Sequence, residues 1–241
     1  MCDRRFLNFL LVAPFFTGCF AKADPAPGSG FLPVQEGQMT YSLELPFQKV
    51  WWDPKVNFKQ YQEIYIAPVN TDYLLQMGWW QELERGSSLQ NDLPDLASFA
   101  QSTFREAFAK DPKKRFRVVN IPHEETLVLR LALTEIIPTK TSLKLAGLIP
   151  GFFIPAKIAG LGSRSTAAFE ARFHDGPNGR VIAMFADREA AKMSIVNAKD
   201  FTWYGHAKGM IQEWAEQFVQ VANKEKYQVV KDSSRFELKP W

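Results

Sequence analysis

The sequence predicts an α+β fold, in which a single mixed β-sheet carries two main helices packed on one face as an α/β sandwich. Apolar residues recur at helical spacing in two well-separated segments, residues 94–110 and 201–224. Other stretches alternate apolar and polar residues with the period of two that is typical of strands. The expected order is strand, helix, strands, hairpin and helix, which favours one sheet with both helices on the same side.

The segments before the first predicted helix are mostly extended. Residues 39–45 are typical of an edge strand, and residues 51–54 end a second extended segment. Residues 63–69 are apolar on both faces, which favours a central strand that ends at Pro68. Residues 73–85 fit either a helical turn or an aromatic loop.

The middle of the chain has clearer signals. A helix is expected from about Pro94 to Lys110, because Asp92 and Pro112 supply its start and stop signals. A strand is expected over residues 116–121. Leucines that alternate with polar residues over 127–137 predict a half-buried strand.

The next stretch contains an irregular segment and a hairpin. Residues 145–161 carry one charge and several glycines and prolines, so we expect neither a long helix nor a membrane span. Residues 167–173 and 180–187 alternate on either side of the turn 175–179. This pattern predicts a β-hairpin with a five-residue loop.

The last helix is expected over about 201–224, with Asp200 as its N-terminal cap. A charged C-terminal tail, 225–241, follows it and includes a short predicted strand at 235–238. We therefore predict a single α+β domain over residues 38–224.

The N-terminus has the features of an export signal. Two arginines precede an apolar run, residues 6–16, which is too short to span a bilayer as a helix. The run ends at Phe16-Thr17-Gly18-Cys19, which resembles a bacterial lipobox, where the cysteine after small residues becomes acylated. We therefore expect residues 1–18 to be a lipoprotein signal peptide and Cys19 to be the lipidation site.

Two alternatives stay open at this end of the chain. Ala21-Lys22-Ala23 has the small-x-small form cut by the ordinary signal peptidase, which would release a soluble periplasmic protein. The apolar run could instead be a buried helix with a chance cysteine. Residues 19–37 are rich in proline and glycine and predict a linker, which could reach up to about 60 Å when fully extended.

The composition excludes several classes of protein. Hydrophobic residues make up 46% of the chain and charged residues 23%, as in globular proteins, not in disordered or membrane-spanning ones. The formal net charge of +3 gives no electrostatic case for nucleic-acid binding. Cys2 and Cys19 both lie near the start, so we expect no disulfide and no thiolate metal site in the body.

No motif with catalytic or cofactor-binding spacing stands out. His123, His174 and His206 lie far apart and lack a second ligand at metal-site spacing. His174 falls on the polar face of a predicted strand beside the turn, so we expect it to be a solvated surface histidine. The chain has no G-x-S-x-G elbow, and residues 160–165 match neither phosphate-binding glycine motif. We expect no catalytic residue, no metal and no cofactor.

Two clusters are candidates for contact with a partner. The first lies in the broken segment 145–161 and consists of Leu148, Ile149, Phe152, Phe153 and Ile154. It is either an exposed docking loop for a protein or a membrane, or core folded over the sheet. The second consists of the pairs Trp51-Trp52 and Trp79-Trp80, which could line a ligand cleft or a partner surface, or could cover a sheet edge.

Several short motifs together resemble a known family. They are Gly30-Phe31-Leu32, Asp53-Pro54, Tyr61-x-x-Ile64-x-Ile66-x-Pro68-Val69, the turn Asp175 to Gly179, and Trp214-Ala215. In this pattern the chain resembles the bacterial lipoproteins catalogued as domain of unknown function 3313, over about residues 30–221. The resemblance implies an envelope lipoprotein and carries over no catalytic or ligand residue.

The expected function is that of a non-enzymatic lipoprotein that binds or scaffolds an envelope protein partner. Phe20 and Ala21 follow Cys19 with no aspartate, which resembles the sorting signal for the periplasm-facing leaflet of the outer membrane. One alternative is an enzyme that acts on cell-wall or lipid substrates. Another is a soluble periplasmic ligand carrier with a closed apolar cavity.

Overall fold

The computed structural model describes residues 23–33, 37–84, 89–145, 147, 164–191 and 202–232. In this part of the chain six strands form one mixed sheet, in the order β1-β6-β5-β4-β2-β3. The strands are β1 (Lys49–Trp52), β2 (Glu63–Ile66), β3 (Arg117–Val118), β4 (Leu127–Ile137), β5 (Thr166–Asp175) and β6 (Val181–Ala190). The pairs β1–β6, β6–β5 and β5–β4 are antiparallel, whereas the pairs β4–β2 and β2–β3 are parallel. The predicted α+β class and mixed sheet are confirmed.

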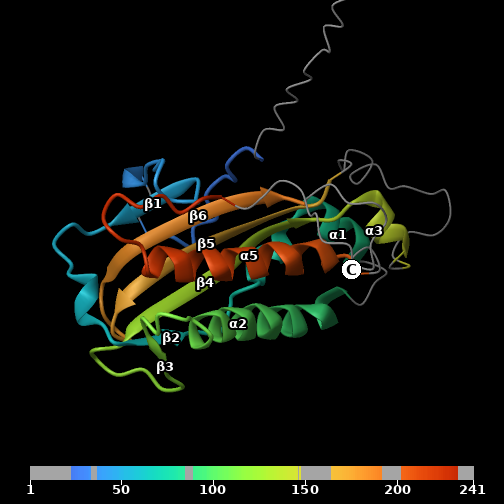
Figure 1. Cartoon of the computed structure of the whole chain (residues 1–241). Helices are drawn as coiled ribbons and strands as arrows, with labels where there is room; N and C mark the ends of the chain where they lie inside the picture. The colour runs from blue at the N-terminus through green and yellow to red at the C-terminus, as the bar shows by residue number, and fades with distance from the viewer. Residues whose placement is uncertain are drawn as a thin grey trace, which may run out of the picture.

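Two long helices lie side by side across one face of this sheet (Figure 1). They are α2 (Leu93–Ala109) and α5 (Gly205–Ala222). The shorter helices in the described residues are α1 (Gly78–Glu84), α3 (Lys140–Leu145) and the 3₁₀ turns η2 (Phe58–Gln60), η3 (Asp72–Gln76) and η4 (Leu89–Asp92). We call the face under α2 and α5 the helix face.

Aromatic side chains fill the space between the helices and the sheet. Trp214 of α5 is 1% exposed and lies edge-on to Phe169 of β5, with ring centroids 4.7 Å apart. Phe104 of α2 is 2% exposed and contacts Phe218 of α5 at 5.5 Å. Both predicted apolar stripes therefore face the sheet, and they drive the helices onto it by burying apolar area.

The predicted hairpin is formed by β5 and β6. Its turn needs glycine, because a Cβ at Gly179 would overlap the carbonyl oxygen of Asp175, and Gly176 has a φ of +75°. The hydroxyl of Tyr61 donates to Asp175 Oδ1 at 2.7 Å and so ties this end of the hairpin to β2. Burial and this hydrogen bond raise the pKa of Tyr61 to about 12.

Several predicted boundaries are wrong in detail. Residues 39–45 form no strand beyond a single bridge from Thr40 to Val50, because Tyr41 and Leu43 are exposed and the segment has no buried face. The strand predicted over 116–121 shortens to β3, since it pairs with β2 at only two positions.

The C-terminal helix also begins later than predicted. It starts at Gly205 and not at 201, because Trp203 turns inward and donates through Nε1 to Asp92 Oδ2 at 2.7 Å. The predicted cap Asp200 and the predicted strand 235–238 lie outside the described residues. Residues 73–85 are helical, as η3 and α1.

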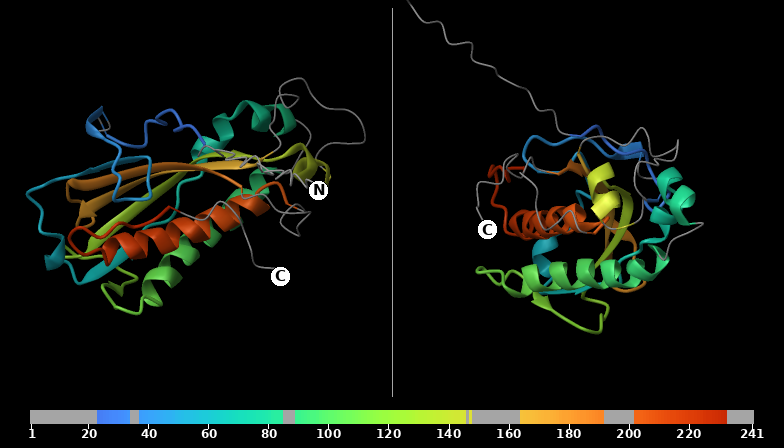
Figure 2. Two further views of the ribbon diagram at one scale, coloured as in Figure 1. Left: turned by 45° about the horizontal axis from the view of Figure 1, so that its top comes forward. Right: turned by 90° about the vertical axis from the view of Figure 1, so that its right-hand side faces the viewer.

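The opposite face of the sheet is covered by residues 23–33, which we call the N-terminal strap (Figure 2). Glu170 of β5 is 3% exposed and accepts hydrogen bonds from the Ser29 backbone N–H at 2.8 Å and the Ser29 hydroxyl at 2.7 Å. Arg172 donates to the Phe31 carbonyl at 2.9 Å, and its guanidinium lies 4.4 Å from the Phe31 ring centroid. The described part of the predicted linker is thus bound to the sheet.

Strands β4 and β5 are more buried than the alternating pattern indicated. Val128 and Ala132 of β4 face away from the helices, yet they are only 1% and 0% exposed. The strap holds polar side chains of the sheet through its own backbone groups. The strap itself is exposed or half-buried except at Leu32, so these hydrogen bonds attach it to the sheet.

We expect Glu170→Ala to loosen the strap and to lower the free energy of unfolding by about 1–3 kcal/mol, because two hydrogen bonds from the half-buried Ser29 to a buried carboxylate are lost. Hydrogen exchange should become faster at the backbone amides of Ser29 and Phe31. Urea unfolding and exchange mass spectrometry measure the two effects. The exposed Glu125→Ala is the matched control, and equal exchange in both variants would contradict the strap's dependence on Glu170.

Candidate functional site

A cavity of about 590 Å³ lies at one end of the helix face, and we call it the end cavity. It opens where the C-terminal ends of α2 and α5 meet the chain after α5 and the segments before β1, β2 and β3. Its apolar lining consists of Leu45, Trp52, Phe58, Phe108, Phe116, Leu127, Phe173, Ala183, Phe185, Phe218, Val221 and Ala222. Its size lies within the range of about 300–1,000 Å³ that is typical of small-molecule sites.

Phenylalanine rings from the sheet and the helices form the floor of the end cavity. Phe185 of β6 contacts Phe173 of β5 at 5.8 Å and Phe218 of α5 at 5.4 Å between ring centroids. On the other side, Phe108 of α2 lies 6.0 Å from Phe116. These rings are less than 9% exposed, so the floor is built by the core itself.

Charged side chains surround the apolar floor. Lys224 donates to Glu44 Oε2 at 2.7 Å, which joins the chain after α5 to the segment before β1. Arg115 donates to the carbonyl oxygens of Tyr61 at 2.8 Å and Phe58 at 2.6 Å, and its guanidinium lies 4.2 Å from the Phe116 ring centroid. Burial lowers the pKa of Arg115.

The four predicted tryptophans separate into different environments. Trp79 and Trp80 are 4% and 1% exposed and pack with Trp203, at 5.5 and 5.1 Å between ring centroids. Trp79 Nε1 also donates to the Ile136 carbonyl at 2.9 Å. This pair therefore forms no exposed aromatic surface and has the structural role of covering the end of β4.

The other tryptophan pair divides between the two faces of the sheet. Trp51 is half-buried and points away from the helices, as the register with Met184 requires. Trp52 pairs with Ala183, is 46% exposed and lies at the mouth of the end cavity. Trp52 is thus the one predicted aromatic residue that the described structure places at a cavity.

The remaining predicted contacts lie outside the described residues. These are the lipidation site Cys19 and the apolar cluster Leu148, Ile149, Phe152, Phe153 and Ile154. Both stay predictions.

The phenylalanines of the end cavity were missed at the sequence level. Each comes from a different strand, helix or loop, and the periodicity of each element explains its phenylalanine as ordinary core. The total of 20 phenylalanines signals a large aromatic core but does not say that part of it is open.

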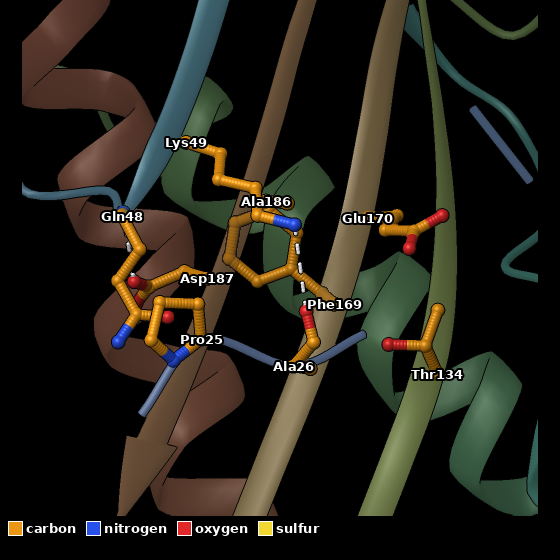
Figure 3. A pocket seen from close by; sticks show the side chains of 9 residues that line it. All are labelled: Pro25, Ala26, Gln48, Lys49, Thr134, Phe169, Glu170, Ala186 and Asp187. Carbon is orange, nitrogen blue, oxygen red and sulfur yellow. Dashed lines mark hydrogen bonds between the residues drawn. The ribbon is translucent and has the colours of Figure 1, made fainter. Parts of the chain in front are cut away.

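A second, much smaller recess lies beneath the N-terminal strap (Figure 3). Pro25 and Ala26 of the strap cross β5 and β6 there, and Lys49 Nζ donates to the Ala26 carbonyl at 3.5 Å. The recess has a volume of about 10 Å³, which is the space of one water molecule. It is an imperfection of the strap–sheet contact and cannot hold a ligand.

His174 is enclosed by its neighbours, contrary to the predicted solvated histidine. Its Nδ1 donates to the Gly179 carbonyl at 3.0 Å, and its buried Nε2 has no hydrogen-bond partner in the described structure. Burial lowers the pKa of His174, and the charges of Arg130 and Arg172 lower it further, against the opposing effect of the bond to Gly179. The neutral imidazole is therefore the folded form near neutral pH.

This shift predicts a loss of stability in mild acid. Below the unfolded-state pKa of about 6.5, the unfolded chain binds a proton at His174 more readily than the folded chain, so stability falls as the pH drops. We expect His174→Gln to reduce the pH dependence of the free energy of unfolding between about pH 5 and 7. Urea unfolding of both proteins at each pH measures it, and parallel curves would contradict the assignment.

The described residues show no sign of metal chemistry or of a membrane span. No group of three or more His, Cys, Asp or Glu side chains in that part of the chain is arranged to hold a metal ion. Likewise, none of the helices described has the length and apolarity that crossing a bilayer requires.

One of the comparisons with known proteins, the match to a family model, agrees with the sequence motifs. The model of a family described as "Protein of unknown function (DUF3313)" matches residues 40–218. No curated protein matches the chain. Among solved structures, the PelC dodecamer from Paraburkholderia phytofirmans is similar at 11% identity, over 70% of this chain and 95% of that chain, with a TM-score of 0.38. A variant of the same dodecamer is similar at 10% identity, over 70% of this chain and 94% of that chain, with a TM-score of 0.36.

Proposed function

The chain belongs to the DUF3313 family, whose function is unknown, and we propose that it is a non-enzymatic lipoprotein that binds another component of the bacterial envelope. The observation that carries this proposal is the end cavity, a large apolar recess with an exposed tryptophan at its mouth. Recesses of this kind usually mark a binding site, because leaving apolar surface in water is unfavourable.

The lining of the end cavity supports binding over catalysis. Its two carboxylates, Glu44 and Glu225, each lie within 4 Å of a lysine, Lys224 and Lys113 respectively. No histidine, cysteine or aspartate is among the residues that line it in the described structure. An enzyme that acts on cell-wall or lipid substrates needs a positioned acid, base or nucleophile, so this lining favours the binding role.

The proposed membrane attachment is at Cys19, on the periplasm-facing leaflet of the outer membrane. The carbonyl oxygen of Ala23 accepts a hydrogen bond from Gln48 Nε2, so Ala23 is held on the body. Only three residues separate it from Cys19, and the four Cα–Cα steps reach at most about 14 Å. The lipid anchor would therefore hold the body close to the membrane surface, and much closer than a free linker over residues 19–37 would allow.

A soluble ligand carrier is the second candidate, because the end cavity suits a carrier as well as an anchored protein. The two differ at the N-terminus, which would be Asp24 in the carrier and an acylated Cys19 in the lipoprotein.

The binding role can be tested without knowing the ligand. We expect native mass spectrometry of the protein purified from its own membranes to show a bound species that is lost in Ala222→Trp. Ala222 ends α5 and lines the end cavity, so an indole there would fill part of it. Ala109→Trp, at the exposed end of α2, is the matched control. A species retained equally by both variants would contradict binding in this cavity.

A further inference from the structure

We propose that the end cavity binds a single-chain lipid with an anionic head, of the long-chain fatty-acid type. The proposal rests on the binding function above and names the class of ligand.

The apolar floor of the end cavity indicates which kind of chemical group can bind over it. Phe173, Phe185 and Phe218, which form the floor of the end cavity, carry no hydrogen-bonding group on their side chains. A sugar or a peptide bound among the phenylalanines would therefore bury hydroxyl or amide groups without partners, which is unfavourable. A hydrocarbon chain has no such groups and gains from leaving water.

The charges at the mouth decide the nature of the head. The lining holds the cations Lys59, Arg115, Lys224 and Lys226 and the carboxylates Glu44 and Glu225. Lys224 is paired with Glu44. Among the described residues, no carboxylate lies within 4 Å of the charged groups of Lys59, Arg115 or Lys226, so the mouth keeps an excess of positive charge.

The position of the head follows from the helix ends. The C-terminus of α5 carries partial negative charge and disfavours a nearby anion, and it accounts for the placement of Lys224. Lys59 and Arg115 come from elements other than α5, namely η2 and the residues just before β3. We place the anionic head beside Lys59 and Arg115 and the chain over Phe173, Phe185 and Phe218.

The test uses the whole protein in phosphatidylcholine vesicles and a photoreactive palmitic acid with a diazirine in its chain. We expect its crosslinks to map to peptides that line the end cavity and to be competed by unlabelled palmitate. Ala222→Trp should reduce these crosslinks at least tenfold, whereas Ala109→Trp should not. Crosslinks spread over the surface, or unchanged in Ala222→Trp, would overturn the proposal.

The head group is tested by comparing palmitate with hexadecanol as competitors in the wild-type protein, which requires no variant to fold. Palmitate should compete more strongly. Lys59→Glu should weaken competition by palmitate about two- to fivefold, as expected for the loss of an exposed charge pair. The same substitution should leave competition by hexadecanol unchanged. Lys231→Glu, which lies outside the cavity lining, is the control. Equal competition by both compounds in the wild-type protein would overturn the anionic head.

The outcomes also separate this inference from the proposed function. If the native species lost in Ala222→Trp proves to be a peptide or a protein, the fatty-acid assignment is wrong while the binding role stands. If no native species depends on Ala222, yet palmitate crosslinks in the cavity, the ligand class stands and the envelope role loses its support.

Discussion

Trp214→Ala is expected to lower the free energy of unfolding by about 3–5 kcal/mol, the usual cost of deleting a fully buried large aromatic side chain. The indole packs on Phe169 and donates through Nε1 to Asp187 Oδ2 at 3.2 Å. Its loss therefore opens a cavity at the centre of the α5–sheet contact and removes a donor from a carboxylate that is 2% exposed. A domain is stable by only some 5–15 kcal/mol, so the effect should be large.

Thermal unfolding should show this change as a fall of roughly 6–20 °C in Tm. Trp214→Phe keeps most of the packing and removes the hydrogen bond, so its Tm should lie between those of the wild-type protein and Trp214→Ala. Tyr41→Ala, at a side chain that is 68% exposed, is the control and should leave Tm nearly unchanged. An unchanged Tm in Trp214→Ala would mean that the helix does not dock on the sheet through this residue.

Cys19→Ser is expected to move nearly all of the protein out of the salt-resistant membrane fraction or to leave its signal peptide uncut. Each buried CH₂ of an acyl chain contributes about 0.8 kcal/mol, and stable attachment takes more than one chain. A lipoprotein cysteine would carry several, whereas serine would carry none.

Membrane fractionation with salt washing, together with mass spectrometry of the N-terminus, measures this effect. Cys2→Ser is the matched control, because Cys2 lies in the predicted signal peptide and should have no effect. An unmodified N-terminus at Asp24 in the wild-type protein would instead establish soluble export.

The secondary structure was largely predictable because it depends on local periodicity. The stripe around Phe104 predicted a helix and the face that it buries, and α2 confirms both. The alternation over 127–137 predicted a strand, which β4 confirms, although β4 is buried on both faces and not half-buried. The short glycine turn between β5 and β6 is likewise a local signal. Family membership was also readable from short motifs, since these motifs are contiguous in the chain.

Features that depend on distant pairing were not predictable in the same way. The two tryptophan pairs look alike in sequence, yet Trp80 is buried beside Trp203 and Trp52 is half-exposed at the end cavity, because the packing of whole elements sets their burial. The strap had the composition of a linker, and only the positions of Glu170 and Arg172 on the sheet show that it is bound.

By itself, the sequence determined the fold class, the order of the main elements and the family, because each of these depends on local patterns. Only the tertiary structure decided where the candidate site lies. The end cavity is assembled from phenylalanines on five separate elements and the loop before β3, and the local pattern of each segment explains its phenylalanine as ordinary core. It exists because those elements leave a gap where the helices end, and such a gap is a property of three-dimensional packing that no local pattern encodes.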